Sequence, residues 1–390
     1  MRSSSSRLRD FVNTYTRDLK AEDLQRLFTR DAREAYEFFA RQIDEKQLQG
    51  LRWHRRALVH LRLFFTAFTM KLSPARRIVY AASLLFAAIG FFNLLRLGMN
   101  QAQAQAGNAS STFSMPDGLL SVVFAFALVN LLVLLEVADR LSLKNDLEIA
   151  REIQKAMLPP GRFRARGADV AAFSRPANTV GGDFYEILPL GDGRLVIAVG
   201  DVAGKGSPAA LLMALLLAMM RTLNDERLEP AELIARLNVQ VCRQAPGNRF
   251  ITLFYALFDM NTGLLTYVNA GHTPPLLLRN RGDVERLHEG GVALGLFDQS
   301  AYGAGRTLMQ PGDLLAVYSD GITESENPEG RPFDERGLEN VLTAERRNNI
   351  AAIGSAVAKA VELYTADTRL ADDLTLLLLR CSTMPAQAGV

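Results

Sequence analysis

Two uninterrupted apolar runs dominate the hydrophobic pattern of the first third of the chain. They are residues 78–95 (IVYAASLLFAAIGFFNLL) and 119–135 (LLSVVFAFALVNLLVLL), and neither contains a charged side chain. A membrane-spanning helix needs about 20 apolar residues, with about 17 as the lower limit, so both runs qualify. The pattern predicts a two-helix transmembrane hairpin, and the alternative is a helical hairpin buried in a soluble domain.

The charges around these runs predict an orientation. Arg76 and Arg77 precede the first run, and Arg140, Lys144 and Arg151 follow the second. The segment between the runs, 96–118, has only Arg96 and Asp117. Because basic residues stay on the cytoplasmic side, we expect both termini in the cytoplasm and a short outer loop.

Residues 7–72 show a helical pattern. Within 51–72 the apolar side chains recur on one face of a 3.6-residue period: Ala57, Leu58, Leu61, Phe64, Phe65 and Phe68. Between Leu51 and Arg77 there are basic residues and no acid. This segment is typical of a basic amphipathic helix on an anionic lipid surface, or of a helix packed in a small cytosolic bundle.

The pattern changes after the second run. Residues 136–158 continue as a helix up to Pro159-Pro160, with an apolar seam that either pairs two protomers in a homodimer or docks on the following domain. Beyond it, β-like runs such as ITLFYALFD alternate with helical stretches near 207–224, 230–244 and 350–364. We expect five regions: 1–76 helical cytoplasmic, 77–136 transmembrane, 137–160 linker, 161–381 a soluble α/β-mixed domain, and 382–390 a tail.

Composition narrows the function classes. The hydrophobic content of 48% and mean hydropathy of +0.05 agree with some membrane-buried length. A net charge of +2 offers no overall attraction for nucleic acid, so no nucleic-acid partner is expected. The two cysteines, Cys242 and Cys381, provide no disulfide or zinc framework.

The stretch AVGDVAGKGSPAA (198–210) superficially matches a phosphate-binding P-loop. Counted from Gly200, however, the second glycine comes one residue early, at Gly204, and Gly206 stands where a hydroxyl is needed. Asp201 therefore needs another explanation.

Paired carboxylates supply that explanation. The turn Gly191-Asp192-Gly193 lies between two strand-like runs, and a hairpin centred on Asp192 places Asp183 opposite Asp201. Like charges facing each other on a sheet repel, and a divalent cation between them converts that repulsion into binding.

Two further acidic positions lie at strand ends. Asp320 closes the apolar run DLLAVYSDG, and Asp372-Asp373 opens LTLLLLR. If these strands are antiparallel, both acidic ends meet at one rim, although Asp-Gly also marks ordinary turns.

Seven segments, in order, resemble the SpoIIE-like branch, of RsbU type, of the PPM (protein phosphatase 2C-like) serine/threonine phosphatases. They are AREIQKAMLPP, VGGDFYE, GDVAGKGSPAALLMA, FITLFYALFD, YVNAGHTPPLLL, VYSDGITESEN and ADDLTLLLL. The resemblance implies an α+β fold, an αββα sandwich of two antiparallel sheets, with two Mn²⁺ or Mg²⁺ ions at one rim.

By the same resemblance, the metal ligands are Asp183, Asp201, the backbone carbonyl of Val202, Asp320 and Asp372, with Asp373 the weaker choice of its pair. Asp183 and Asp201 would be the catalytic residues, holding the bridging water that attacks phosphorus. The implied substrate is phosphoserine or phosphothreonine on a STAS-type anti-sigma factor antagonist. The implied location is the bacterial cytoplasmic membrane, with the catalytic domain in the cytoplasm.

The sequence leaves the roles of several residues, and two alternative functions, open. Glu186 stands where the family often has a second aspartate, Lys205 has no assigned role, and His272 is expected to be structural. GGDFYE also resembles the GGDEF signature of diguanylate cyclases, but Phe184 occupies an acidic position of that motif. A non-enzymatic alternative is a membrane receptor or scaffold with a degenerate phosphatase domain.

Overall fold

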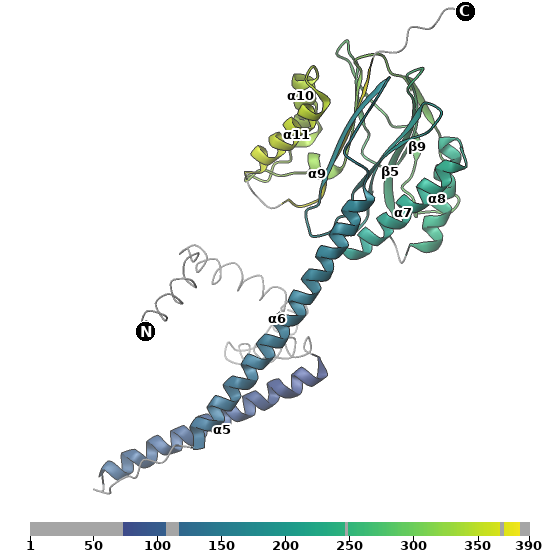
Figure 1. The fold of residues 1–390 in the computed structure, drawn as a ribbon. Helices are drawn as coiled ribbons and strands as arrows, with labels where there is room; N and C mark the ends of the chain where they lie inside the picture. Colours follow the sequence, from purple (N-terminus) through teal and green to yellow (C-terminus); the bar gives the residue numbers. More distant parts are fainter. Residues whose placement is uncertain (1–72, 107–116, 246–248, 367–369, 383–390) are drawn as a thin grey trace, which may run out of the picture. The chain divides into compact units, whose positions relative to one another are not determined.

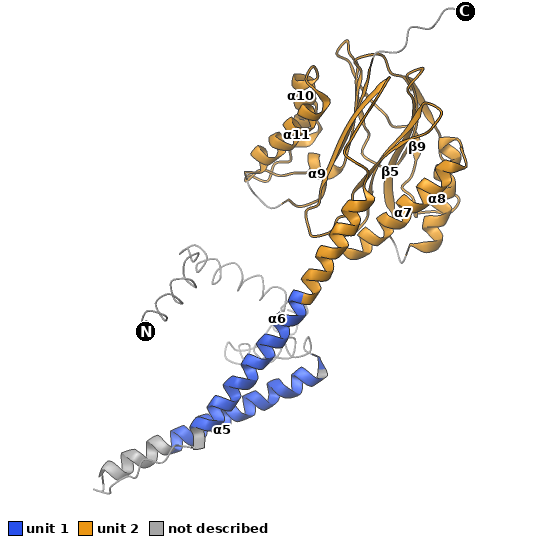
Figure 2. Ribbon diagram, viewed as in Figure 1, with its two compact units in different colours: residues 1–141 blue, residues 142–390 orange. Residues whose placement is uncertain are grey.

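The computed structural model describes residues 73–106, 117–245, 249–366 and 370–382 (Figure 1). The predicted helices of 7–72, including the basic amphipathic segment 51–72, lie outside the described residues. The chain divides into two compact units, residues 1–141 and 142–390, with the boundary inside one helix (Figure 2).

The first unit contains two long apolar helices. Helix α5 spans Pro74–Ala106 and helix α6 spans Asp117–Met157. They pack against each other within this unit: Arg76 pairs with Glu136 at 3.2 Å and with Asp139 at 2.6 Å. The rings of Phe86 and Phe124 meet edge to face, with centroids 4.8 Å apart.

The apolar runs form the outward surface of these helices. Phe91, Phe92, Phe126 and Leu134 are each about two-thirds exposed, because few neighbours cover them. Segments Ala75–Arg96 and Leu119–Met157 are long and apolar enough to cross a membrane. Large apolar side chains facing outward all round a helix are typical of contact with lipid.

Helix α6 is continuous for 41 residues, from the start of the second apolar run to Met157. It ends just before Pro159 and Pro160, as the sequence predicts, because a proline cannot continue the helical hydrogen-bond ladder. Its last turns belong to the second unit.

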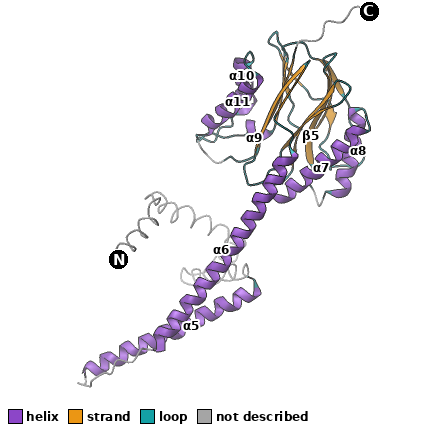
Figure 3. Cartoon of the chain, in the orientation of Figure 1, coloured by secondary structure: helices purple, strands orange, loops and turns teal. Residues whose placement is uncertain are grey.

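The second unit is an αββα sandwich (Figure 3). One sheet has the order β1-β2-β12-β11-β7-β8, and the other has the order β10-β6-β5-β4-β3, with β9 added beside β6. The strands are β1 Arg162–Ala165, β2 Ala168–Arg175, β3 Phe184–Pro189, β4 Arg194–Val202, β5 Ile251–Asp259, β6 Leu264–Ala270, β7 Leu276–Leu278, β8 Val284–Arg286, β9 Gly290–Gly291, β10 Gly305–Leu308, β11 Leu314–Tyr318 and β12 Leu374–Cys381.

Helices cover the outer face of each sheet (Figure 3). Helices α7 Ser207–Asp225 and α8 Pro230–Gln244 share a buried cluster with the β3–β6 sheet. Helices α9 Asp320–Thr323, α10 Asp334–Glu345 and α11 Ile350–Thr365 share a second cluster with the other sheet. A third cluster fills the space between the sheets. The predicted fold class is confirmed.

Helix α7 also has the length and composition of a membrane span. Its buried residues, among them Leu212, Met213, Leu216 and Met220, pack into the core of the second unit instead. Hydrophobicity alone therefore does not separate this core helix from α5 and α6.

Candidate metal-dependent phosphatase site

The β3–β4 hairpin positions the first two acids. Phe184 lies opposite Gly200, and Glu186 lies opposite Ala198, which is the register predicted for a turn centred on Asp192. Asp183 and Asp201 are the next pair beyond this ladder. The turn is closed by a 2.8 Å hydrogen bond from the Leu190 N–H to the Arg194 carbonyl.

Asp183 is only 4% exposed. Within the described part of the chain, its Oδ2 has no hydrogen-bond partner. Burial raises the pKa of Asp183 well above its usual range, and the nearby charge of Asp201 raises it further. A buried carboxylate oxygen without a hydrogen-bond partner is costly unless a cation compensates it.

Asp201 lies close enough to the acids at the ends of β11 and β12 to feel their charges. Burial raises its pKa to about 6, and the charges of Asp320, Asp372 and Asp373 add to the shift. Strands β11 and β12 are antiparallel, with Tyr318 opposite Leu376, so the end of one lies beside the start of the other. The predicted meeting of acidic strand ends at one rim is thus observed.

The adjacent residues Asp372 and Asp373 have different environments. Asp373 is 6% exposed, and its carboxylate accepts hydrogen bonds from the backbone N–H groups of Ala177, Gly182 and Asp183 at 2.7–3.3 Å. Asp372 is half-exposed on the rim. Asp373 therefore holds the 177–183 segment in place. Asp372 accepts a hydrogen bond from the Asp373 N–H at 2.9 Å and points its other carboxylate oxygen to the exposed side of the rim.

Lys205, from the loop after β4, contributes a positive charge at this rim. Its Nζ lies 3.0 Å from Asp372 Oδ2 and donates a hydrogen bond to the Ala371 carbonyl at 2.7 Å. It also lowers the pKa of Asp320, which burial and Asp372 raise. Lys205 thereby partly balances the acidic rim.

The donor set fits divalent magnesium or manganese. A Cβ added at Gly182 would lie 2.8 Å from the Val202 carbonyl and 2.9 Å from Asp201 Oδ1, so both oxygens border the same small space. Such all-oxygen donors suit hard cations. Among the described residues, no three His, Cys, Asp or Glu side chains form a ready-made ligand cluster. The excess of negative charge and the orphaned oxygen on Asp183 are compatible with a bound cation, and the metal site itself stays a prediction.

Glu186 faces away from this rim. Successive side chains alternate across a strand, so Phe184 and Glu186 face α7 while Asp183 and Tyr185 face the interior between the sheets. Glu186 Oε2 pairs with Arg221 Nε of α7 at 2.6 Å. The family's acidic position is occupied here by a residue that ties β3 to a helix.

Gln154, near the end of α6, contacts the segment that carries Asp183. Its amide nitrogen donates to the Gly181 carbonyl at 2.7 Å, and its oxygen accepts from the Gly181 N–H at 3.2 Å. The side chain is 8% exposed. It lies inside the AREIQKAMLPP motif, but its partner is visible only in the fold.

His272 has a structural environment, as the sequence predicts. Its Nδ1 shares a 3.0 Å hydrogen bond with Thr252 Oγ1, and its backbone N–H donates to Asn269 Oδ1. Burial lowers the pKa of His272 to about 4, so the ring is neutral near pH 7. Among the residues that the structure describes, no acid is paired with His272 to make it a general base.

Comparisons with known proteins agree with this architecture. Residues 191–382 match the family model of stage II sporulation protein E (SpoIIE). The phosphoserine phosphatase RsbU of Bacillus subtilis is 29% identical over 242 residues, covering 61% of this chain and 70% of RsbU. Protein IcfG of Synechocystis is 30% identical over 244 residues, covering 55% of this chain but only 38% of IcfG. The SiaA PP2C domain of Pseudomonas aeruginosa has the same fold, with TM-score 0.55, 22% identity, and coverage of 62% of this chain and 98% of that domain.

The fold and the acidic rim define a PP2C-like phosphatase domain. Residues 191–382 form a SpoIIE-type domain, and the relatives that share it include the phosphoserine phosphatases RsbU and RsbP of Bacillus subtilis. Enzymes of the wider PPM family are metal-dependent.

Proposed function

We propose that the chain is a membrane-anchored, Mn²⁺- or Mg²⁺-dependent protein phosphatase that removes phosphate from phosphoserine or phosphothreonine. The observation that carries the proposal is the convergence of Asp183, Asp201, Asp320 and Asp372 on one rim, where burial and then neighbouring carboxylates raise the pKa values of Asp183, Asp201 and Asp320. Such mutual repulsion is an unfavourable arrangement that a bound cation relieves.

The ligands of the two ions would be Asp183, Asp201, the Val202 carbonyl, Asp320 and Asp372. When bound, the ions supply an activated water at neutral pH and neutralise charge on the phosphoryl oxygens. Asp183 and Asp201 fix the position of that chemistry, because the hairpin register and the hydrogen bonds of Asp373 to residues 177–183 hold their backbone. No side-chain nucleophile is required.

The substrate we propose is a phosphorylated STAS-type anti-sigma factor antagonist, in keeping with the likeness to RsbU. The two spans would anchor the enzyme in a bacterial cytoplasmic membrane, with residues 51–77 on the lipid surface and the catalytic unit in the cytoplasm. A homodimer through residues 136–158 would bring two linker helices together. The substrate is proposed from the likeness to RsbU, and the membrane location from the two apolar helices.

The proposal is tested by incubating the full chain, in lipid nanodiscs with Mn²⁺, with phosphorylated STAS proteins from the same genome. We expect release of inorganic phosphate from at least one of them, and no release by the Asp201→Asn variant. Hydrolysis of aryl phosphate without release from any STAS protein would retain the phosphatase and overturn the substrate assignment. If the chain is instead a non-enzymatic scaffold, it should release phosphate neither from aryl phosphate nor from any STAS protein.

A further inference from the structure

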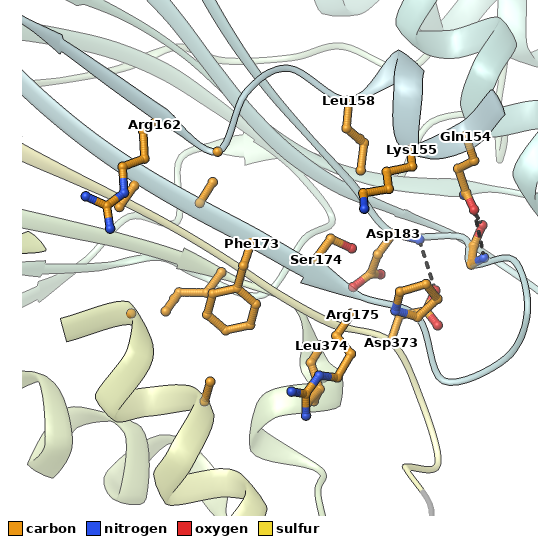
Figure 4. Close-up of a pocket in the computed structure, with 18 of the residues that line it drawn as sticks. Gln154, Lys155, Leu158, Arg162, Phe173, Ser174, Arg175, Asp183, Asp373 and Leu374 are labelled. Carbon is orange, nitrogen blue, oxygen red and sulfur yellow. Dashed lines mark hydrogen bonds between the residues drawn. The ribbon is translucent and has the colours of Figure 1, made fainter. Parts of the chain in front are cut away.

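A groove on the second unit adjoins the acidic rim at Asp183. It has a volume of about 490 Å³ and runs between the end of α6, strand β2 and helix α11 (Figure 4). Volumes of roughly 300–1,000 Å³ are usual for sites of small organic ligands. Its inner end reaches Asp183 and Asp373, while the rest of its lining is apolar and basic.

The floor of the groove is apolar. Phe173, Leu374 and Leu376 of the sheet and Leu158 after α6 line it. The α11 side is built of small residues, so no long side chain of this helix fills the space. A Cβ added at Gly354 would stand 3.9 Å from Phe173 Cδ1, an ordinary contact distance, so this position has room for a side chain.

The lining includes four basic side chains from three elements. Arg151 and Lys155 come from α6, Arg162 from β1 and Arg175 from the end of β2. Figure 4 shows the last three. All four are exposed, and none of them has an ion pair among the described residues. Elsewhere on this unit exposed arginines do pair, as Arg236 does with Glu226 at 2.6 Å.

The two acids of the lining do not neutralise these cations. Asp373 already accepts three backbone hydrogen bonds, and Asp183 is buried at the inner end. A ligand suited to this groove therefore has an apolar body for the floor and an anionic group for the basic rim. Neither a neutral apolar molecule nor a cation satisfies both parts.

We propose that this groove is a binding site for a small organic anion with an apolar or aromatic body, adjoining the proposed metal site at Asp183. Such a ligand would contact Gln154 and Gly181, which adjoin the segment carrying Asp183. The inference rests on the groove itself and holds whether or not the chain is a phosphatase.

The test is binding of para-trifluoromethylbenzoate to the full chain in nanodiscs, followed by fluorine NMR line broadening. A ligand of this size in a matching site is expected to bind with a dissociation constant of about 1 mM. The neutral analogue para-trifluoromethylbenzamide, at the same concentrations, should bind about tenfold more weakly, because it lacks the charge. Empty nanodiscs provide the background.

Two variants locate the binding. Arg162→Gln with Arg175→Gln should weaken benzoate binding about tenfold, whereas the charge-matched control Arg243→Gln with Arg336→Gln, outside the groove, should leave it unchanged. Gly354→Leu should abolish binding by filling the groove. Exposure of the buried Cys381 thiol on heating reports whether each variant is folded. Equal binding by wild type and the Arg162/Arg175 variant, equal binding of benzoate and benzamide, or no saturable binding by wild type would each overturn the proposal.

Discussion

The Nζ of Lys205 lies 3.0 Å from Oδ2 of Asp372, so a positive charge from the chain itself occupies one carboxylate of the acidic rim. The two side chains are 55% and 46% exposed, which keeps the pair weak in water. A divalent cation at this carboxylate has to displace the lysine.

Replacing Lys205 should therefore tighten metal binding. Lys205→Gln removes the competing charge, and we expect the dissociation constant for Mn²⁺ to fall up to about fivefold. Electron paramagnetic resonance of free Mn²⁺ in a titration of the full chain measures it. Lys205→Arg, which keeps the charge, is the matched control. A weaker or unchanged affinity in Lys205→Gln would show that the lysine does not compete with the metal.

Gln154 should couple α6 to the segment that carries Asp183. Gln154→Ala removes two buried hydrogen bonds with Gly181 and should lower the free energy of unfolding by about 1–3 kcal/mol. Mn²⁺ affinity should fall as well, because the 181–183 backbone loses its support. The exposed neighbour Glu152→Ala is the control, measured by the same metal titration and by thermal unfolding.

A change of helix register tests the same coupling without touching Gln154. One alanine inserted after Asn145 rotates the following part of α6 by about 100° relative to the preceding part. Phosphatase activity of the full chain should change if signals pass along this helix. Activity equal to wild type after insertions of one, two and three residues would argue that the catalytic unit works independently of it.

The absence of a side chain at Gly182, beside Asp201, should be essential for metal binding. Gly182→Ala places a Cβ within 3 Å of the Val202 carbonyl and of Asp201 Oδ1, so the oxygens bordering the site must move. We expect at least a tenfold loss of Mn²⁺ affinity, equivalent to about 1.4 kcal/mol. Gly191→Ala, in the turn of the same hairpin with no atom near its Cβ, should behave as wild type. Equal affinities of the two variants would place the metal elsewhere.

His272 should make the second unit sensitive to acid. Burial lowers its pKa to about 4, whereas the unfolded chain has an ordinary value of about 6.5. Between these values only the unfolded state takes up the proton, so the stabilisation present above about pH 6.5 is lost as the pH falls towards 4. The loss amounts to as much as about 3 kcal/mol.

His272→Gln should flatten this dependence. Thermal unfolding in chelator, followed by exposure of the buried Cys381 thiol, would be compared at pH 7 and pH 5. His288→Gln, at an exposed position, should keep the wild-type slope. A variant at position 272 that loses stability with acid as steeply as wild type would contradict the assignment.

The β3–β4 hairpin and the strands that carry the acidic rim could be predicted from turn residues and apolar runs in the sequence. The turn at Asp192 set the β3–β4 register, and that register alone brought Asp183 opposite Asp201. The apolar runs predicted β5 and β12 and placed Asp320 near Asp372. Helix α10 was missed, because its sequence is mostly polar and only Leu338 and Leu342 are buried.

Roles that depend on tertiary contacts could not be read from the chain. Asp372 and Asp373 are neighbours with the same side chain, yet only the fold directs Asp373 to the backbone of residues 177–183. Glu186 is paired with Arg221, 35 residues away, and Gln154 with Gly181, 27 residues away. Such partners follow from packing between elements.

The central claim is that the acidic rim catalyses metal-dependent hydrolysis of phosphate esters. Its most direct test is the rate of para-nitrophenyl phosphate hydrolysis by the full chain in nanodiscs, with Mn²⁺ and with excess chelator. We predict activity only with the metal, and a loss of at least about a hundredfold in Asp201→Asn. Activity that persists in chelator, or that Asp201→Asn leaves intact, would contradict the account.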